Sequence, residues 1–312
     1  MSRRIVAIGE CMVELAPRDE PGTFAMGFAG DTMNTAWYLA RLLPQDWAVD
    51  YFTAVGTDAL SQRMVDFLGD AGIGAASIRR IDDRTVGLYM IELRDGERSF
   101  SYWRGESAAR LLAADAAALD AGLDGAEVAY FSGITLAILS PEDRTRLVAA
   151  LARFRSAGGT VVFDPNLRPK LWASSAAMCE AVTAAAGVAD IALPSFDDEA
   201  RWFSDADPEA TARRYHAAGV KTVVVKNGAA DVVVLDGDTA PVHFAVPPAE
   251  RVVDTTAAGD SFSAGYLAAR LKGRSPVEAA RSAHRIAAVV IQHRGAVIPR
   301  EAMAGVLEAE SR

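Results

Sequence analysis

The stretch Arg251-Val-Val-Asp254-Thr-Thr-Ala-Ala258-Gly259-Asp260-Ser-Phe-Ser-Ala-Gly265 runs from a short apolar segment, through a turn of small residues, into a predicted helix. Small residues let backbone N–H groups approach a ligand, and the start of a helix leaves several such groups unpaired. The partial positive charge at that point favours an anion. Asp260 therefore has two interpretations, a helix cap or a base beside a bound phosphoryl group. The stretch alone favours the cap.

Composition excludes several classes of protein. The chain has 312 residues, 51% of them apolar, and a net charge of −9, so it can bury a large core in one or two domains. The acidic balance argues against nucleic acid or an anionic membrane as the main partner. Two cysteines, Cys11 and Cys179, are too few for a disulfide framework. The four histidines lack metal-ligand spacing. No apolar run reaches the roughly 20 residues of a membrane span, and no signal-peptide pattern precedes the first predicted strand. We expect a soluble, cytoplasmic protein.

Short apolar runs alternate with helical patterns along most of the chain. The runs that indicate buried strands are Arg4–Gly9, Val128–Gly133, Thr160–Asp164, Asp190–Leu193 and Lys221–Lys226. The helical patterns include Ala36–Leu43, the segment after Ser140-Pro141, Pro208–Ala218 and Pro276–His293. This rhythm predicts an α/β fold, in which helices flank a mostly parallel central sheet.

Two strand-like runs, Val86–Leu93 and Arg98–Arg104, do not follow this alternation of strands and helices. They flank the dipeptide Asp95-Gly96, which is typical of a hairpin turn. Side chains alternate along a strand, so Phe100, Tyr102 and Arg104 share one face. That face suits a polar ligand, although a solvated edge strand has the same pattern. A hairpin inserted in an α/β chain is typical of a lid or a dimer contact.

Polar residues follow several predicted strands, at the edge where open α/β sheets bind ligands. Asp31 and Asn34 offer two groups for vicinal hydroxyls, or else an N-cap with a polar neighbour. Arg168, between two prolines, could present its guanidinium to a carboxylate or phosphate, or form a surface ion pair. The acidic run 197–199 could order magnesium through water, or be the acidic first turn of a helix. The segment Lys226-Asn227-Gly228 could line a nucleotide or be only a turn.

The chain resembles the ribokinase (PfkB-type) family of sugar kinases over nearly its whole length. The segment 254–265 is similar to the family's C-terminal signature, and Gly30-Asp31…Asn34 to its N-terminal sugar-binding signature. Within the family the chain is most similar to 2-keto-3-deoxygluconate kinases. The segments that carry this likeness are Gly9–Leu15, Gly30–Thr35, Tyr102-Trp103-Arg104, Ser132–Ala137 and Asp164–Trp172.

The resemblance implies a single ribokinase-like domain, 1–312, with a small β lid from inserted strands near 10–30 and 85–105 that often mediates dimerisation. It implies an ATP-dependent kinase that phosphorylates the terminal (C6) hydroxyl of 2-keto-3-deoxygluconate, with ATP and Mg²⁺ and with room for a monovalent cation. Asp260 would be the catalytic base, beside an anion hole formed by the N–H groups of Ala257, Ala258 and Gly259. The implied substrate contacts are Gly30, Asp31, Asn34, Tyr89, Tyr102, Arg104 and Arg168. The implied nucleotide contacts are Ser195, Lys226, Gly228 and Gly259.

Two departures from the family pattern affect the site. Ala29 replaces the first glycine of the usual Gly-Gly-Asp. Ser195 replaces the Asn of the family's Asn-x-x-Glu magnesium motif, with Asp198 at the Glu spacing and Glu199 beside it. The sequence leaves open which of these two carboxylates orders magnesium.

The physical argument for a sugar-acid kinase is the charge of its substrate. Phosphoryl transfer needs a positioned base and fixed donors for the transferring group, and one short segment supplies both. A keto-deoxy sugar acid carries a carboxylate, for which Arg104 and Arg168 are the candidate cations. A kinase for a neutral sugar such as fructose or ribose is the nearest alternative, and a non-catalytic sugar-binding regulator comes next. A nicotinamide dehydrogenase is disfavoured because the first strand lacks the Gly-x-Gly-x-x-Gly turn.

Overall fold

The computed structural model describes residues 3–94, 97–247 and 249–311. Its main sheet has eight strands in the order β14-β13-β12-β11-β10-β9-β1-β4. The six strands from β12 to β4 pair in parallel, and β13 and β14 extend the sheet in antiparallel pairing at one edge. The predicted α/β fold with a mostly parallel sheet is confirmed.

The main-sheet strands are β1 (Arg3–Ile8), β4 (Trp47–Phe52), β9 (Val128–Ser132), β10 (Thr160–Asp164), β11 (Ile191–Ala192), β12 (Thr222–Val225), β13 (Val232–Asp236) and β14 (Val242–Phe244). A second sheet contains β2 (Met12–Pro17), β3 (Phe24–Ala29), β7 (Gly87–Arg94) and β8 (Glu97–Trp103), and a short pair contains β5 (Ala54–Val55) and β6 (Arg79–Arg80). The α-helices are α1 (Asp31–Leu42), α2 (Ala59–Asp70), α3 (Ala116–Leu123), α4 (Gly133–Ile138), α5 (Pro141–Ser156), α6 (Ser175–Ala186), α7 (Phe196–Phe203), α8 (Pro208–Ala217), α9 (Ala258–Leu271), α10 (Pro276–Val290) and α11 (Met303–Ser311). Three short 3-10 helices are η1 (Ala108–Leu111), η2 (Pro169–Leu171) and η3 (Arg300–Ala302).

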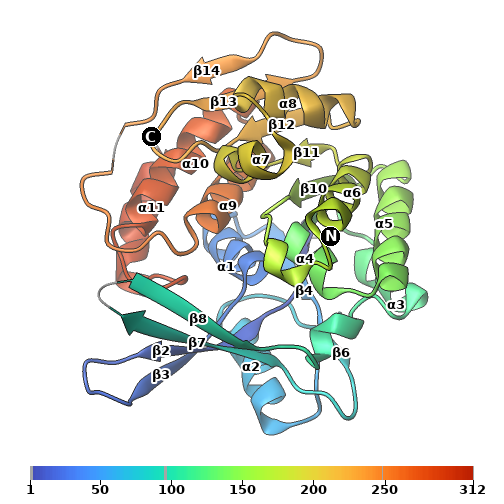
Figure 1. The fold of residues 1–312 in the computed structure, drawn as a ribbon, viewed down its shortest axis with the longest axis vertical. Helices are drawn as coiled ribbons and strands as arrows, with labels where there is room; N and C mark the ends of the chain where they lie inside the picture. Colours follow the sequence, from blue (N-terminus) through green and yellow to red (C-terminus); the bar gives the residue numbers. More distant parts are fainter. Residues whose placement is uncertain (1–2, 95–96, 248, 312) are drawn as a thin grey trace.

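Helices cover both faces of the main sheet (Figure 1). Because side chains alternate along a strand, β1 contributes Ile5 and Ala7 to one core and Val6 and Ile8 to the other. The first core lies against α1, α9 and α10, and the second against α3, α5, α6 and α8. The strands are thus buried on both sides, which explains why they appear in the sequence as continuous apolar runs.

The second sheet has the order β3-β2-β7-β8 and lies at one end of the molecule in Figure 1. The strands β7 and β8 pair as the expected antiparallel hairpin, while its turn dipeptide, Asp95-Gly96, lies outside the described residues. Parallel pairing of β2 with β7 joins the two inserted segments into one sheet. The register places Glu14, Tyr89 and Tyr102 on one face of this sheet, and Met26 and Trp103 on the other.

One predicted boundary is wrong in a way that matters for the site. The sequence predicts a helix over Ala36–Leu43, after the polar residues Asp31 and Asn34. In the structure α1 begins at Asp31, with Gly30 as its N-cap. A carboxylate in the first turn is favourable beside the unpaired N–H groups of a helix start, so Asp31 extends the helix. Asn34 consequently lies on the helix, where it faces α9.

Candidate active site

The start of α9 is a tight turn of small residues. Ala257 is the N-cap and has a left-handed backbone, φ 58°, which costs energy for a residue with a side chain. The N–H of Ala258 donates to the carbonyl of Thr255 at 3.1 Å. The N–H groups of Ala257 and Gly259 meet no acceptor in the described part of the chain. Two expected donors of the anion hole are thus free for a ligand, and the third is used within the turn.

Asp254 stabilises this turn through hydrogen bonds of its side chain. Its carboxylate accepts from the N–H and hydroxyl of Thr256, at 3.0 and 2.7 Å, and from the N–H of Gly295 at 2.7 Å. The side chain is buried. These bonds give Asp254 a structural role in the turn before α9.

Asp260 lies in the first turn of α9, and its side chain contacts α1. The side-chain amide of Asn34 donates to Asp260 Oδ2 at 2.8 Å, and the Thr35 hydroxyl donates to the Asp260 carbonyl at 3.3 Å. Burial, and then the nearby charge of Asp31, raise the pKa of Asp260 to about 8. The residue as a whole is only partly buried. The two signature segments, 226 residues apart at Asn34 and Asp260, therefore meet at one carboxylate.

The turn before α1 packs closely on the segment after β1. A Cβ added at Gly30 would lie only 2.2 Å from the carbonyl oxygen of Glu10, so glycine is required at this position. Asp31 accepts from the side-chain amide of Asn166 at 2.8 Å. Asn166, from the loop after β10, was not among the predicted site residues. The bond spans 135 residues, so no local pattern in the sequence indicated it.

Lys226 connects the end of β12 with β10 and α9. Its ammonium group donates to Asp164 Oδ2 at 2.8 Å, and the Ser263 hydroxyl donates to the same oxygen at 3.0 Å. A Cβ added at Gly259 would lie 3.5 Å from Lys226 Nζ, so this cation is beside the turn that precedes Asp260. The other oxygen of Asp164 is buried and has no partner among the described residues. Asp164 and Ser263 were missed as site residues, although Asp164 ends a predicted strand at the ligand-binding edge.

The second sheet contributes Tyr89, Tyr102 and Arg104. The Tyr89 hydroxyl donates to Glu14, and the Tyr89 and Tyr102 rings lie 5.9 Å apart. Tyr102 is 52% exposed and also stacks with Phe100. The guanidinium carbon of Arg104 is 5.9 Å from the centre of the Tyr102 ring, so the predicted common face exists. Arg104 forms an ion pair with buried Glu10, a partner that the sequence pattern did not identify.

Arg168 and Asp198 face each other across the loop after β10. Arg168 Nη1 lies 3.7 Å from Asp198 Oδ2, and the Arg168 side chain is 52% exposed. Burial raises the pKa of Asp198, while Arg168 opposes that effect. Arg168 is therefore in a surface ion pair in this state, one of the two alternatives that its position in the sequence allowed.

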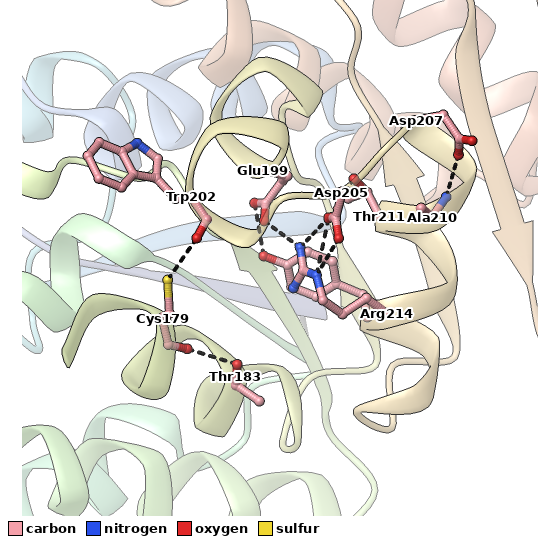
Figure 2. A network of polar contacts seen from close by, with 10 residues as sticks. Cys179, Thr183, Glu199, Trp202, Asp205, Asp207, Ala210, Thr211 and Arg214 are labelled. Carbon is pink, nitrogen blue, oxygen red and sulfur yellow. Dashed lines mark hydrogen bonds and ion pairs between the residues drawn. The ribbon is translucent and has the colours of Figure 1, made fainter. Parts of the chain in front are cut away.

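Glu199 belongs to a separate network between α7 and α8 (Figure 2). Its side chain is fully buried and accepts from Arg214 at 2.6 Å and from the Tyr215 hydroxyl at 3.0 Å. Arg214 also bonds Asp205 at 2.7 Å. Burial raises the pKa of Glu199 to about 7, although Arg214 and Tyr215 oppose it. Both oxygens of Glu199 are occupied inside this network, which argues against Glu199 and leaves Asp198 as the candidate for ordering magnesium.

The remaining predicted nucleotide contacts lie next to each other at the carboxyl ends of β11 and β12. Ser195 is the N-cap of α7 and forms a β-bridge with Lys226. Gly228 has φ 55° within the turn that follows β12. Across the described residues there is no group of three or more His, Cys, Asp or Glu side chains arranged to bind a metal ion. Within the same residues, no helix is long and apolar enough to cross a membrane.

Known proteins resemble this chain over its whole length. It is 45% identical to 2-dehydro-3-deoxygluconokinase of Escherichia coli (strain K12), over 97% of this chain and 99% of that protein. The crystal structure of a PfkB protein from Polaromonas sp. JS666 superposes with a TM-score of 0.84 at 29% identity, covering 97% of this chain and 99% of that one. The fructokinase from Xylella fastidiosa with bound ATP has the same TM-score at 22% identity, covering both chains completely, and shows the shared fold.

A family model described as pfkB family carbohydrate kinase matches residues 2–303. That match includes the second sheet, both signature segments and the turn before Asp260. The predicted ribokinase-like fold, in which a separate small sheet accompanies the main sheet, is therefore confirmed. The chain belongs to the pfkB family of carbohydrate kinases.

Proposed function

We propose that this protein transfers the γ-phosphoryl group of ATP to the terminal hydroxyl of 2-keto-3-deoxygluconate. The observation that carries the proposal is the position of Asp260. Its carboxylate accepts a hydrogen bond from the Asn34 side-chain amide at 2.8 Å, and it directly follows the turn with free N–H groups. The proposal is also supported by 45% identity to a relative named 2-dehydro-3-deoxygluconokinase. We further propose that residues 1–312 act as one kinase domain, with the second sheet as its lid.

Asp260 acts as the general base in this proposal. A sugar hydroxyl is a poor nucleophile at neutral pH, and a carboxylate within hydrogen-bond reach can accept its proton as the phosphoryl group moves. A pKa near 8 makes Asp260 a stronger proton acceptor than an ordinary carboxylate. Asn34 fixes the orientation of the carboxylate, and Gly30 keeps the adjoining turn close to it.

The free N–H groups of Ala257 and Gly259 form the anion hole, while the N–H of Ala258 stays bonded to Thr255 and holds the turn in shape. Fixed donors at a helix start stabilise the charge that develops on the transferring group, without the need to reorganise solvent. The ammonium group of Lys226, which also pairs with Asp164, lies beside Gly259 and contributes positive charge to the same place. Phosphoryl transfer depends mainly on such positioning and charge, which this turn provides.

The sugar acid lies between the turn before α1 and the second sheet. Asp31 and Asn34 bind its hydroxyl groups, and Tyr89 and Tyr102 pack against its carbon chain. Arg104 and Arg168 bind the carboxylate, the group that distinguishes this substrate from a neutral sugar. A neutral sugar would leave the buried guanidinium of Arg104 without that partner, which reduces its binding.

The nucleotide lies along Ser195, Lys226 and Gly228. Mg²⁺ prefers carboxylate oxygens and usually binds through one or two of them together with substrate phosphates. The partly buried Asp198 and the unpartnered oxygen of Asp164 fit this need, and Asp198 lies close enough to Asp164 to sense its charge. When bound, magnesium neutralises phosphate charge. A monovalent cation remains an expectation from the family resemblance.

Two further expectations accompany this proposal. We propose that the protein forms a homo-oligomer through the second sheet, because that sheet exposes Phe24, Met26, Phe100 and Trp103. A cytoplasmic location fits an ATP-dependent enzyme in which both Cys11 and Cys179 are free thiols.

A panel of sugars tests the proposed function. ADP release is measured with saturating ATP and 2-keto-3-deoxygluconate, its galactonate-derived epimer, fructose or ribose. We expect the highest kcat/KM with a keto-deoxy acid. Equal or better turnover of fructose or ribose would identify a neutral-sugar kinase. A protein that binds sugars but phosphorylates none of them would be a regulator.

A further inference from the structure

Glu10 lies just after β1, buried between the main sheet and the second sheet. Its side chain is 1% exposed. Arg104 Nη2 donates to Glu10 Oε2, and the Ser107 hydroxyl donates to Glu10 Oε1. Both carboxylate oxygens are therefore bonded to residues that follow β8. This pair ties the end of the second sheet to the main sheet.

Two glycines, Gly87 and Gly30, leave the space that Glu10 occupies. A Cβ added at Gly87, the first residue of β7, would lie 2.9 Å from Glu10 Oε1 and 3.2 Å from Cβ of Arg104. The carbonyl of Glu10 packs against Gly30, where an added Cβ would be 2.2 Å away. Glu10 thus contacts the turn before α1 through its backbone and Arg104 through its side chain.

Arg104 keeps donors that Glu10 does not use. Its side chain is 10% exposed, and its Nε has no hydrogen-bond partner among the described residues. A guanidinium group has five N–H donors, and a buried donor without an acceptor costs free energy. A ligand carboxylate would supply acceptors for these remaining donors while Glu10 keeps the group in place.

We propose that Glu10 is a positioning residue for recognition of the substrate carboxylate, because it orients Arg104 before the sugar acid binds. The inference rests on the proposed function, in which Arg104 contacts that carboxylate. Without Glu10, the long and flexible side chain of Arg104 would have to become ordered on binding, which would weaken binding of the sugar acid. With Glu10, the guanidinium is already fixed and its charge is balanced before the sugar acid binds.

A double-mutant cycle tests whether Glu10 acts through Arg104. The four proteins are wild type, Glu10→Gln, Arg104→Ala and the double variant. Each is assayed for kcat and for the Michaelis constants of its two substrates, the keto-deoxy acid and ATP. In the wild-type background we expect Glu10→Gln to raise KM for the acid about tenfold, the loss typical of one misaligned charge-assisted hydrogen bond. We expect kcat and KM for ATP to change less than about threefold on the same argument. In the Arg104→Ala background, Glu10→Gln should have no further effect on KM for the acid.

The matched control is Glu106→Gln, which removes an exposed carboxylate paired with Arg84 and should leave all three constants unchanged. Equal effects of Glu10→Gln in both backgrounds, no effect in either, or an equal rise in KM for ATP would each overturn the inference. Glu10→Asp withdraws the carboxylate but keeps its charge, and replaces Glu10→Gln in the cycle if that variant does not fold. Failure of the proposed function would be distinct, because wild-type protein would then leave the keto-deoxy acid unphosphorylated.

Discussion

The substitution Asp260→Asn should sharply reduce activity and stabilise the fold at the same time. The asparagine side chain has nearly the same shape and can still accept the hydrogen bond from Asn34. It cannot accept a proton at neutral pH, so kcat should fall by about 10²–10⁴, the usual contribution of a general base. The gain in stability follows from the raised pKa of the carboxyl that is removed.

The magnitude can be worked from that pKa. Below pH 3.8 the carboxyl is protonated in both folded and unfolded chains, and it contributes nothing to pH dependence. Between 3.8 and about 8 only the folded chain keeps the proton, so the wild-type free energy of unfolding falls as pH rises. Four pH units at about 1.4 kcal/mol each give a ceiling of about 6 kcal/mol at pH 8. Because Asp260 is partly exposed, we expect roughly 2–3 kcal/mol from Asp260→Asn, after allowance for screening by solvent.

Chemical unfolding between pH 6 and 9 and ADP release measure the two effects on the same protein. The stability gain should grow with pH up to about 8 and then stay constant. Asp58→Asn is the matched control, because Asp58 caps α2 and its pKa is below the ordinary value. That variant should lose a little stability at pH 8 and keep its activity. A destabilised or fully active Asp260→Asn protein would refute the reasoning.

Three other perturbations test separate parts of the structure. Asp31→Asn removes a charge that raises the pKa of Asp260, so the acidic limb of the kcat/KM profile should move to lower pH; an unchanged midpoint would contradict this. Arg214→Met leaves buried Glu199 and Asp205 without their cation and should cost about 3–5 kcal/mol of unfolding free energy in denaturant titration. The control Arg213→Met breaks an exposed pair with Glu209 and should leave the unfolding free energy nearly unchanged. Phe24→Glu should lower the mass of the oligomer in light scattering. The control Leu307→Glu changes an exposed apolar residue on α11 and should not lower it. Equal masses for the two variants would argue against an interface on the second sheet.

The main sheet was predictable because its strands are buried on both faces. Thr160–Asp164 has the predicted bounds, and Arg4–Gly9 differs from β1 by one residue at each end. The start of α1 was not predictable in the same way, since Gly30 and the polar residues after it have the composition of a loop. The parallel pairing of β2 with β7 also leaves no local signal, because it joins segments far apart in the sequence.

The candidate site shows the same difference between residues in local sequence motifs and residues defined by long-range contacts. Asp260, Asn34 and Lys226 could be proposed from the sequence because each occurs in a short segment with its own pattern. Glu10 belongs to Gly9–Leu15, one of the segments that carry the family likeness, but its proposed role follows only from the bond to Arg104, 94 residues away. Such long-range partners depend on tertiary packing, which the sequence pattern does not encode locally.

The contacts of Asp260 support one of its two interpretations, the general base, over the other, the helix cap. A capping carboxylate accepts from the N–H groups of its own helix, as Asp58 does from Leu60 and Ser61. Burial opposes the charge of Asp58, yet these bonds leave its pKa below the ordinary value. Asp260 makes no such bond: α9 has no side-chain cap, and the partner of Asp260 is Asn34 on another helix. The pKa of Asp260 is raised instead, although it lies in the first turn, where a helix start favours a charged carboxylate. A helix cap explains neither feature, whereas both are consistent with the proposed general base, whose carboxylate is oriented by Asn34 and makes no bond to its own helix start.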